Sequence, residues 1–196
     1  MRGALVITLL MLTGREVLAQ GLEFAVARFA SHSSHTLYAG YQVGPGLLFG
    51  GVLQNPRSAY REALFGVGRA FGQSGRAVTV GVAAATTSAG NYAQLYVLPS
   101  IGVGALSVDA TITAQAAFAG GPAELYLSPA TATAPVGSLL RVGATWAYAG
   151  TFGRSGEHAL GPTVSAEIPG GALGVHVLRG LGDRPHEVWL TARVTP

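Results

Sequence analysis

The run Glu187-Val188-Trp189-Leu190-Thr191-Ala192-Arg193-Val194 decides the fold class of this chain. Apolar residues stand at every second position from Val188, and the positions between them carry mainly charge or a hydroxyl. A period of two places the two sets on opposite faces of a β-strand. The run therefore predicts a strand with one oily face and one mostly polar face.

Similar runs recur along the chain, separated by Gly, Pro, Asn and Ser. In residues 106–115, for example, Leu, Val, Ala and Ile alternate with Ser, Asp, Thr and Gln. The pattern predicts twelve strands, or ten, because the runs at 92–98 and 123–128 are weak or short. The expected strands are 21–30, 35–43, 46–54, 62–71, 76–86, 92–98, 105–118, 123–128, 138–150, 160–168, 172–179 and 186–194.

The composition conflicts with an ordinary soluble domain. The chain is 49% hydrophobic and only 11% charged, whereas soluble domains carry about 25% charged residues. Yet no stretch after the N-terminus offers the roughly 18 unbroken apolar residues that a membrane helix needs. An all-β, closed antiparallel up-and-down transmembrane barrel of ten to twelve strands reconciles both observations, because its oily face meets lipid.

The first 19 residues predict an export signal. Arg2 precedes an apolar core at residues 4–12, and Val17 and Ala19 occupy the −3 and −1 places of a cleavage site. Residues 20–196 then form a single barrel domain. Cysteine is absent, which excludes disulfides and thiolate metal sites, and 12 basic against 9 acidic residues give no basic stripe for nucleic acid.

The connectors are expected to differ between the two ends of the barrel. The tight turns Gly44-Pro45, Gln73-Ser74-Gly75 and Pro169-Gly170-Gly171 would lie on the periplasmic side with both termini. Longer polar loops at 55–61, 151–159 and 180–185 would lie outside. This asymmetry is typical of bacterial barrels. Pro129 to Gly137 is an exception, since it predicts a long connector on the periplasmic side.

Taken together, these features resemble the small outer-membrane β-barrel proteins of Gram-negative bacteria, as a class and over the whole mature chain. The resemblance implies a monomer in the outer membrane, inserted by the barrel-assembly machinery and without a cofactor. Such barrels commonly end on an aromatic residue, whereas this sequence ends with Thr195-Pro196.

The alternate positions that carry polar side chains, which we call the polar parity, are expected to line the lumen. The apolar positions between them form the oily parity. The charged and titratable members of the polar parity are Asp109, Arg141, Glu167, His176, Glu187 and Arg193. One interpretation is a network of paired charges that fills a narrow lumen, since buried charges must be paired. The other is a constriction that selects small solutes by charge and size. Bulky neighbours of the same parity, such as Gln94, Gln115, Tyr96 and Trp189, favour a plugged or very narrow lumen.

Two further groups of residues fall in the expected outer loops. Arginine forks match phosphate geometry, so we expect lipopolysaccharide phosphates as partners of Arg57, Arg61, Arg154 and Arg184. Four histidines on the same side could bind zinc or copper if their loops converged, but we favour solvated histidines: His32, His35, His158 and His186.

Two alternatives remain open. The cluster Ser31-His32-Ser33-Ser34-His35 suggests an outer-membrane lipid hydrolase, but a Gly-x-Ser-x-Gly elbow and a nearby acid are missing, so we expect no enzyme. A secreted soluble barrel with its oily parity inward would carry an apolar ligand. Tyr41, Trp146 and Tyr148 favour the membrane, because they stand on the oily face near strand ends.

Overall fold

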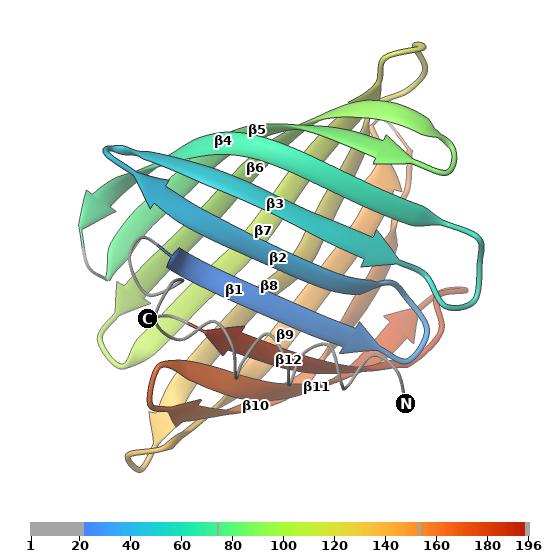
Figure 1. The fold of residues 1–196 in the computed structure, drawn as a ribbon. Coiled ribbons are helices and arrows are strands. Elements are labelled where there is room, and N and C mark those ends of the chain that lie inside the picture. Colours follow the sequence, from blue (N-terminus) through green and yellow to red (C-terminus); the bar gives the residue numbers. More distant parts are fainter. Residues whose placement is uncertain (1–21, 74, 153, 195–196) are drawn as a thin grey trace.

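A computed structural model describes residues 22–73, 75–152 and 154–194, and these form one closed antiparallel barrel (Figure 1). Each strand pairs with its neighbours in sequence, and β1 pairs with β12 from Ala25 opposite Val194 to Ala30 opposite Trp189. The expected signal peptide lies outside the described residues. The twelve strands are β1 (Leu22–Ala30), β2 (His35–Val43), β3 (Gly46–Gln54), β4 (Arg61–Gln73), β5 (Arg76–Thr87), β6 (Gly90–Val103), β7 (Leu106–Ala117), β8 (Glu124–Val136), β9 (Leu140–Thr151), β10 (Glu157–Ile168), β11 (Gly171–Leu181) and β12 (Glu187–Val194).

The expected long connector from Pro129 to Gly137 is wrong, because most of it belongs to β8. The register of β8 against both neighbours shifts between Leu127 and Ala130, which marks a β-bulge. Proline is tolerated at a bulge because ladder hydrogen bonds are interrupted there anyway. Sequence periodicity broke at Pro129 for the same reason. The connector to β9 is only residues 137–139.

The two ends of the barrel differ as expected. At the end where β1 starts and β12 stops, which we call the terminal rim, every connector has two or three residues. Several of these turns need a glycine with positive φ, such as Gly44 at 56° and Gly104 at 60°. At the opposite end, the loop rim, connectors have four to six residues, except for the two-residue turn at 88–89.

The oily parity faces outward. Val164, Val175 and Leu190 are cross-strand neighbours on β10, β11 and β12, and each is exposed. The positions beside them, Thr163 and His176, are buried inside the barrel. An apolar outer surface with polar side chains at the neighbouring inward positions is the arrangement expected of the membrane barrel, and it is the opposite of the soluble ligand carrier.

Strand β4 follows the same rule. Leu64 and Gly66 are buried, whereas Phe65 and Val67 are exposed. Arg69 therefore lies on the outer face, near the terminal-rim end of β4, with its guanidinium 5.5 Å from the ring of Phe71. No described segment forms a helix long and apolar enough to cross a membrane.

Candidate functional site in the barrel interior

One half of the interior is filled with apolar side chains. Trp189 and Leu178 are each 1% exposed, although both project to the inside of the barrel. They pack against three alanines from neighbouring strands, Ala30, Ala147 and Ala159. Small residues on β1, β9 and β10 thus make room for an indole ring inside the barrel. These two side chains therefore occupy the inside of the barrel on this side.

A buried histidine continues the filling toward the terminal rim. The Nδ1 atom of His176 lies 2.8 Å from the Thr145 hydroxyl and 2.9 Å from the Thr163 hydroxyl. The Nε2 atom lies 3.1 Å from the hydroxyl of Thr191. Both ring nitrogens are therefore engaged with hydroxyl groups of strands β9, β10 and β12. His176 acts here as a bridge between strands.

The other half of the interior carries a ladder of amides and carboxylates across β4 to β8. Gln94 Nε2 donates to Glu62 Oε1 at 2.8 Å and to Gln115 Oε1 at 3.0 Å. Gln115 Nε2 then donates to Glu124 Oε2 at 2.6 Å. The ladder passes over β5, where Ala83 and Ala85 leave the space open. It holds two carboxylates without a cationic partner among the described residues.

Phenol hydroxyls complete this ladder. Tyr60 donates to Glu62 at 2.8 Å and Tyr126 donates to Glu124 at 2.7 Å, while Tyr96 donates to the Gln94 amide oxygen. Burial and the hydrogen bond to Glu62 raise the pKa of Tyr60, which lies in the connector before β4. The phenol therefore stays a donor at neutral pH. Polar and aromatic groups together line this wall.

Glycine positions let a further aromatic ring lie flat against the wall. The ring of Phe49 covers Gly66 and Gly81, where an added Cβ would lie 2.5 Å and 2.7 Å from it. Its edge meets Tyr96 with ring centroids 5.3 Å apart. Any larger residue at Gly66 or Gly81 would push Phe49 further into the lumen.

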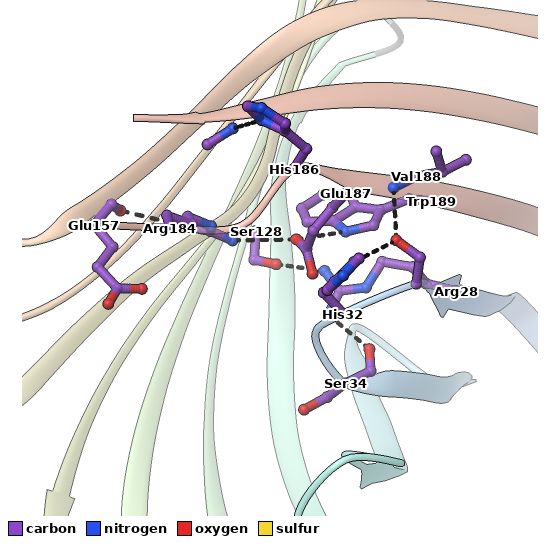
Figure 2. A network of polar contacts seen from close by, with 12 residues as sticks. Arg28, His32, Ser34, Ser128, Glu157, Arg184, His186, Glu187, Val188 and Trp189 are labelled. Carbon is purple, nitrogen blue, oxygen red and sulfur yellow. Dashed lines mark hydrogen bonds and ion pairs between the residues drawn. The ribbon is translucent and has the colours of Figure 1, made fainter. Parts of the chain in front are cut away.

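One side chain crosses the interior from wall to wall. Arg28 on β1 donates from Nη1 to the Ser128 hydroxyl on β8 (Figure 2). These two strands are five positions apart around the wall in one direction and seven in the other. The Arg28 guanidinium also lies 4.6 Å from the centre of the Trp189 ring and 3.5 Å from the Ser34 carbonyl oxygen. It thus divides the lumen.

A carboxylate network lies beside this crossing, at the loop rim (Figure 2). Glu187 accepts a hydrogen bond of 3.0 Å from the Trp189 indole and forms an ion pair of 3.5 Å with Arg184. Arg184 also donates to the backbone oxygen of Glu157 at 3.4 Å. Arg184 is therefore directed to the mouth of the barrel. The other arginines expected to meet lipid phosphates, Arg57, Arg61 and Arg154, are exposed at the loop rim.

The six expected lumen residues occupy different depths. Glu187 and His176 are buried, Asp109 and Arg141 are half-buried, and Glu167 and Arg193 are exposed near the terminal rim. Asp109 accepts hydrogen bonds from Ser100 at 2.6 Å and Ser107 at 3.1 Å, and Arg141 donates to Thr133 at 3.0 Å. Among the described residues, these six form no ion pair with one another. Hydroxyl groups serve as partners of Asp109, Arg141 and His176 instead.

Sequence reasoning missed two central residues, Arg28 and Glu62. In residues 22–30 both parities are largely apolar, so Arg28 did not mark an inward face. Glu62 stands at the start of β4, where a charge fits a loop equally well. Only Glu62 could have been recognised from the sequence, because it stands at the same alternate positions of β4 as Leu64 and Gly66, which face inward.

The histidines of the loop rim do not converge. His35 and His186 accept from the backbone amides of Ala30 and Gly180, each at 3.2 Å, and His158 stacks on Trp146. No metal-binding group of three His, Cys, Asp or Glu residues occurs in the described part of the chain.

The Ser/His cluster does not form a triad either. Ser31 Oγ lies 2.9 Å from His32 Nδ1, and the same oxygen accepts from the Val188 amide at 3.0 Å. No described carboxylate orients His32. An imidazole without an acid partner lacks the orienting group of a catalytic triad.

Comparison with known proteins identifies solved structures with a similar fold. No family model and no curated protein matches the chain. Its fold is similar to the KdgM porin solved in complex with disordered oligogalacturonate, with a TM-score of 0.63 and 12% identity over 90% of this chain and 99% of that chain. For the NanC porin the TM-score is 0.59 and the identity is 11%, over 89% of this chain and 98% of that chain. For the outer membrane protein Omp33 of Acinetobacter baumannii the TM-score is 0.50 and the identity is 13%, over 90% of this chain and 99% of that chain. The chain therefore has the fold of a twelve-stranded, porin-like β-barrel.

Proposed function

We propose that this protein is a non-catalytic outer-membrane barrel that passes small hydrophilic solutes through a narrow lumen. The observation that carries the proposal is the contrast between the two faces of one closed wall. Large apolar side chains are exposed all around the outside, whereas the inside carries amides, carboxylates and hydroxyls beside the packed Trp189 and Leu178. Such a wall is stable in lipid and wettable within.

The lumen is narrow because strand side chains fill it. Connectors between the described strands have at most six residues, so no long loop is available to fold inward. The constriction instead comes from Trp189 and Leu178 on one side, from the Glu62 to Glu124 ladder on the other, and from Arg28 between them. The KdgM porin was solved in complex with disordered oligogalacturonate. For this chain we propose smaller solutes.

The charged residues of the inner parity are proposed to act at successive depths. Glu187 and His176 stand at or near the constriction, whereas Asp109 and Arg141 lie closer to the terminal rim, where Glu167 and Arg193 are exposed. A lumen lined by both signs selects by local charge and by size. These six residues are therefore proposed as the lumen lining.

The apolar outer surface and the exposed arginines also support a proposal for where the barrel resides and what it contacts. We propose export through the N-terminal signal, insertion by the barrel-assembly machinery, and a monomer in the outer membrane. The exposed guanidinium groups of Arg57, Arg61 and Arg154 are proposed to bind lipopolysaccharide phosphates, because a guanidinium fork matches phosphate oxygens. Arg184, whose guanidinium also forms the ion pair with Glu187, is proposed to join these phosphate contacts at the mouth of the barrel.

Planar-bilayer recording of the purified, folded protein tests the pore function. We expect small, reproducible current steps, because ions can pass a wettable but nearly filled lumen. The matched control is the same sample boiled before reconstitution, which should give no steps. Complete absence of current from the folded protein would contradict a pore. Large, stable currents would contradict the narrow lumen.

A further inference from the structure

We infer that the Arg28 side chain, which spans the lumen from β1 to β8 and which we call the bar, closes the lumen. We also infer that its guanidinium is the main determinant of the charge selectivity of the pore. The inference rests on the proposed pore function, because it names the residue that controls that pore. Its geometric basis is the contact between β1 and β8 on nearly opposite sides of the wall.

The bar stands at the level where the lumen is already reduced. Trp189 lies beneath the guanidinium on the filled side, and Tyr38 lies beside it, covering Gly51. Solutes must therefore pass close to Arg28. A side chain that spans the remaining gap decides how large a solute can pass.

The bar is held by few contacts. A guanidinium offers five N–H donors, but Arg28 uses only the Ser128 hydroxyl and the Ser34 carbonyl oxygen, and its buried Nε has no hydrogen-bond partner among the described residues. Its contacts to Ser128 and Ser34 are to neutral groups, which bind less strongly than a carboxylate does. Rotation of the side chain away from Ser128 therefore breaks one hydrogen bond to a neutral hydroxyl and opens the lumen.

Arg28 also forms no ion pair among the described residues, although the charge of Glu187 acts on it through space. Glu187, the carboxylate of the same region, is bound to Arg184 instead, and its Oε1 atom has no partner in the described structure. An unpaired guanidinium at the narrowest point attracts anions and repels cations. Loss of this charge would leave Glu62, Glu124 and Glu187 to dominate the lumen.

Single-channel recording of Arg28→Ser tests the inference. We expect a several-fold larger conductance than in the wild type, together with a reversal potential shifted toward cation selectivity. Arg28→Lys keeps the charge but loses the planar fork, so we expect intermediate conductance with the wild-type selectivity. Arg179→Ser, an exposed arginine on the outward parity of β11, is the matched control and should leave both quantities unchanged.

Thiol crosslinking provides a second readout in a chain without cysteine. In the double variant Arg28→Cys, Ser128→Cys, a short bis-methanethiosulfonate reagent should form a disulfide with each thiol, releasing methanesulfinate each time, and so bridge the lumen and lower the conductance. Reduction should restore it. The single variant Arg28→Cys should show no such reversible block.

The outcomes separate the inference from the pore function. If the wild type conducts and Arg28→Ser conducts equally, Arg28 is not the bar, although the pore stands. If the wild type and both Arg28 variants are silent although folded, the pore function itself fails, and the inference fails with it. A normal fold is checked by the difference in gel mobility between unheated and boiled samples.

Discussion

Val175→Arg is expected to destabilise the folded barrel in a lipid bilayer by about 2–4 kcal/mol, the cost of Arg on the lipid face at mid-depth. Val175 lies near the middle of β11, faces outward and is 44% exposed. Its cross-strand neighbours Val164 and Leu190 are also exposed and apolar, so the new charge finds no polar partner on this face. Urea titration of folding into phospholipid vesicles measures the change in free energy.

Val103→Arg is the matched control, since it makes the same substitution on the same face at another depth. Val103 is the last residue of β6, at the terminal rim, and is 61% exposed. Arg near the interface costs only about 0–1 kcal/mol. The natural Arg69 shows that the outer face tolerates arginine toward this rim. Equal costs for the two variants would mean that this surface does not cross a bilayer.

Trp189→Ala is expected to lower the free energy of unfolding by about 3–5 kcal/mol, as for other buried Trp→Ala changes. The indole is 1% exposed, and its removal leaves a cavity among Leu178 and its alanine neighbours. It also removes the hydrogen bond to Glu187 and the ring that supports Arg28. Urea-induced unfolding in vesicles gives the change.

Trp146→Ala is the control for this effect. Trp146 lies on the outer face, is 43% exposed and stacks on His158. Its loss removes the ring contact and the hydrogen bond of 3.2 Å to His158 without opening an internal cavity, so we expect a smaller destabilisation. A larger loss for Trp146→Ala than for Trp189→Ala would show that the interior is not packed as described.

The sequence predicted the wall of the barrel well, because a strand in a closed sheet has only two faces. Alternation along 140–148 and 187–194 sufficed to assign outward Val142 and Leu190 and inward Thr145 and Trp189, as the burial of these residues confirms. Short turns could be recognised because they need glycine at positive φ, as at Gly104. Local chemistry thus determines each of these features.

The contacts inside the barrel could not be predicted, because they depend on register. Residues of the same parity on different strands meet only if they stand at the same height. Asp109 and Arg141 share a face, yet each binds hydroxyl groups near its own height. Likewise Arg28 meets Ser128 only because the bulge in β8 lies level with Arg28, near the loop-rim end of β1, and the closed wall places the two strands across the lumen.

The two tryptophans allow the most direct test of the central claim, that the apolar face meets lipid and the polar face encloses the lumen. Chains with Trp189→Phe or Trp146→Phe each retain a single indole, one outside and one inside. Each is folded into vesicles containing lipids with brominated acyl chains, which quench an indole on contact. We predict strong quenching of Trp146 and little quenching of Trp189. Quenching of Trp189 but not of Trp146 would contradict the account, because the inner face would then be the one that meets lipid.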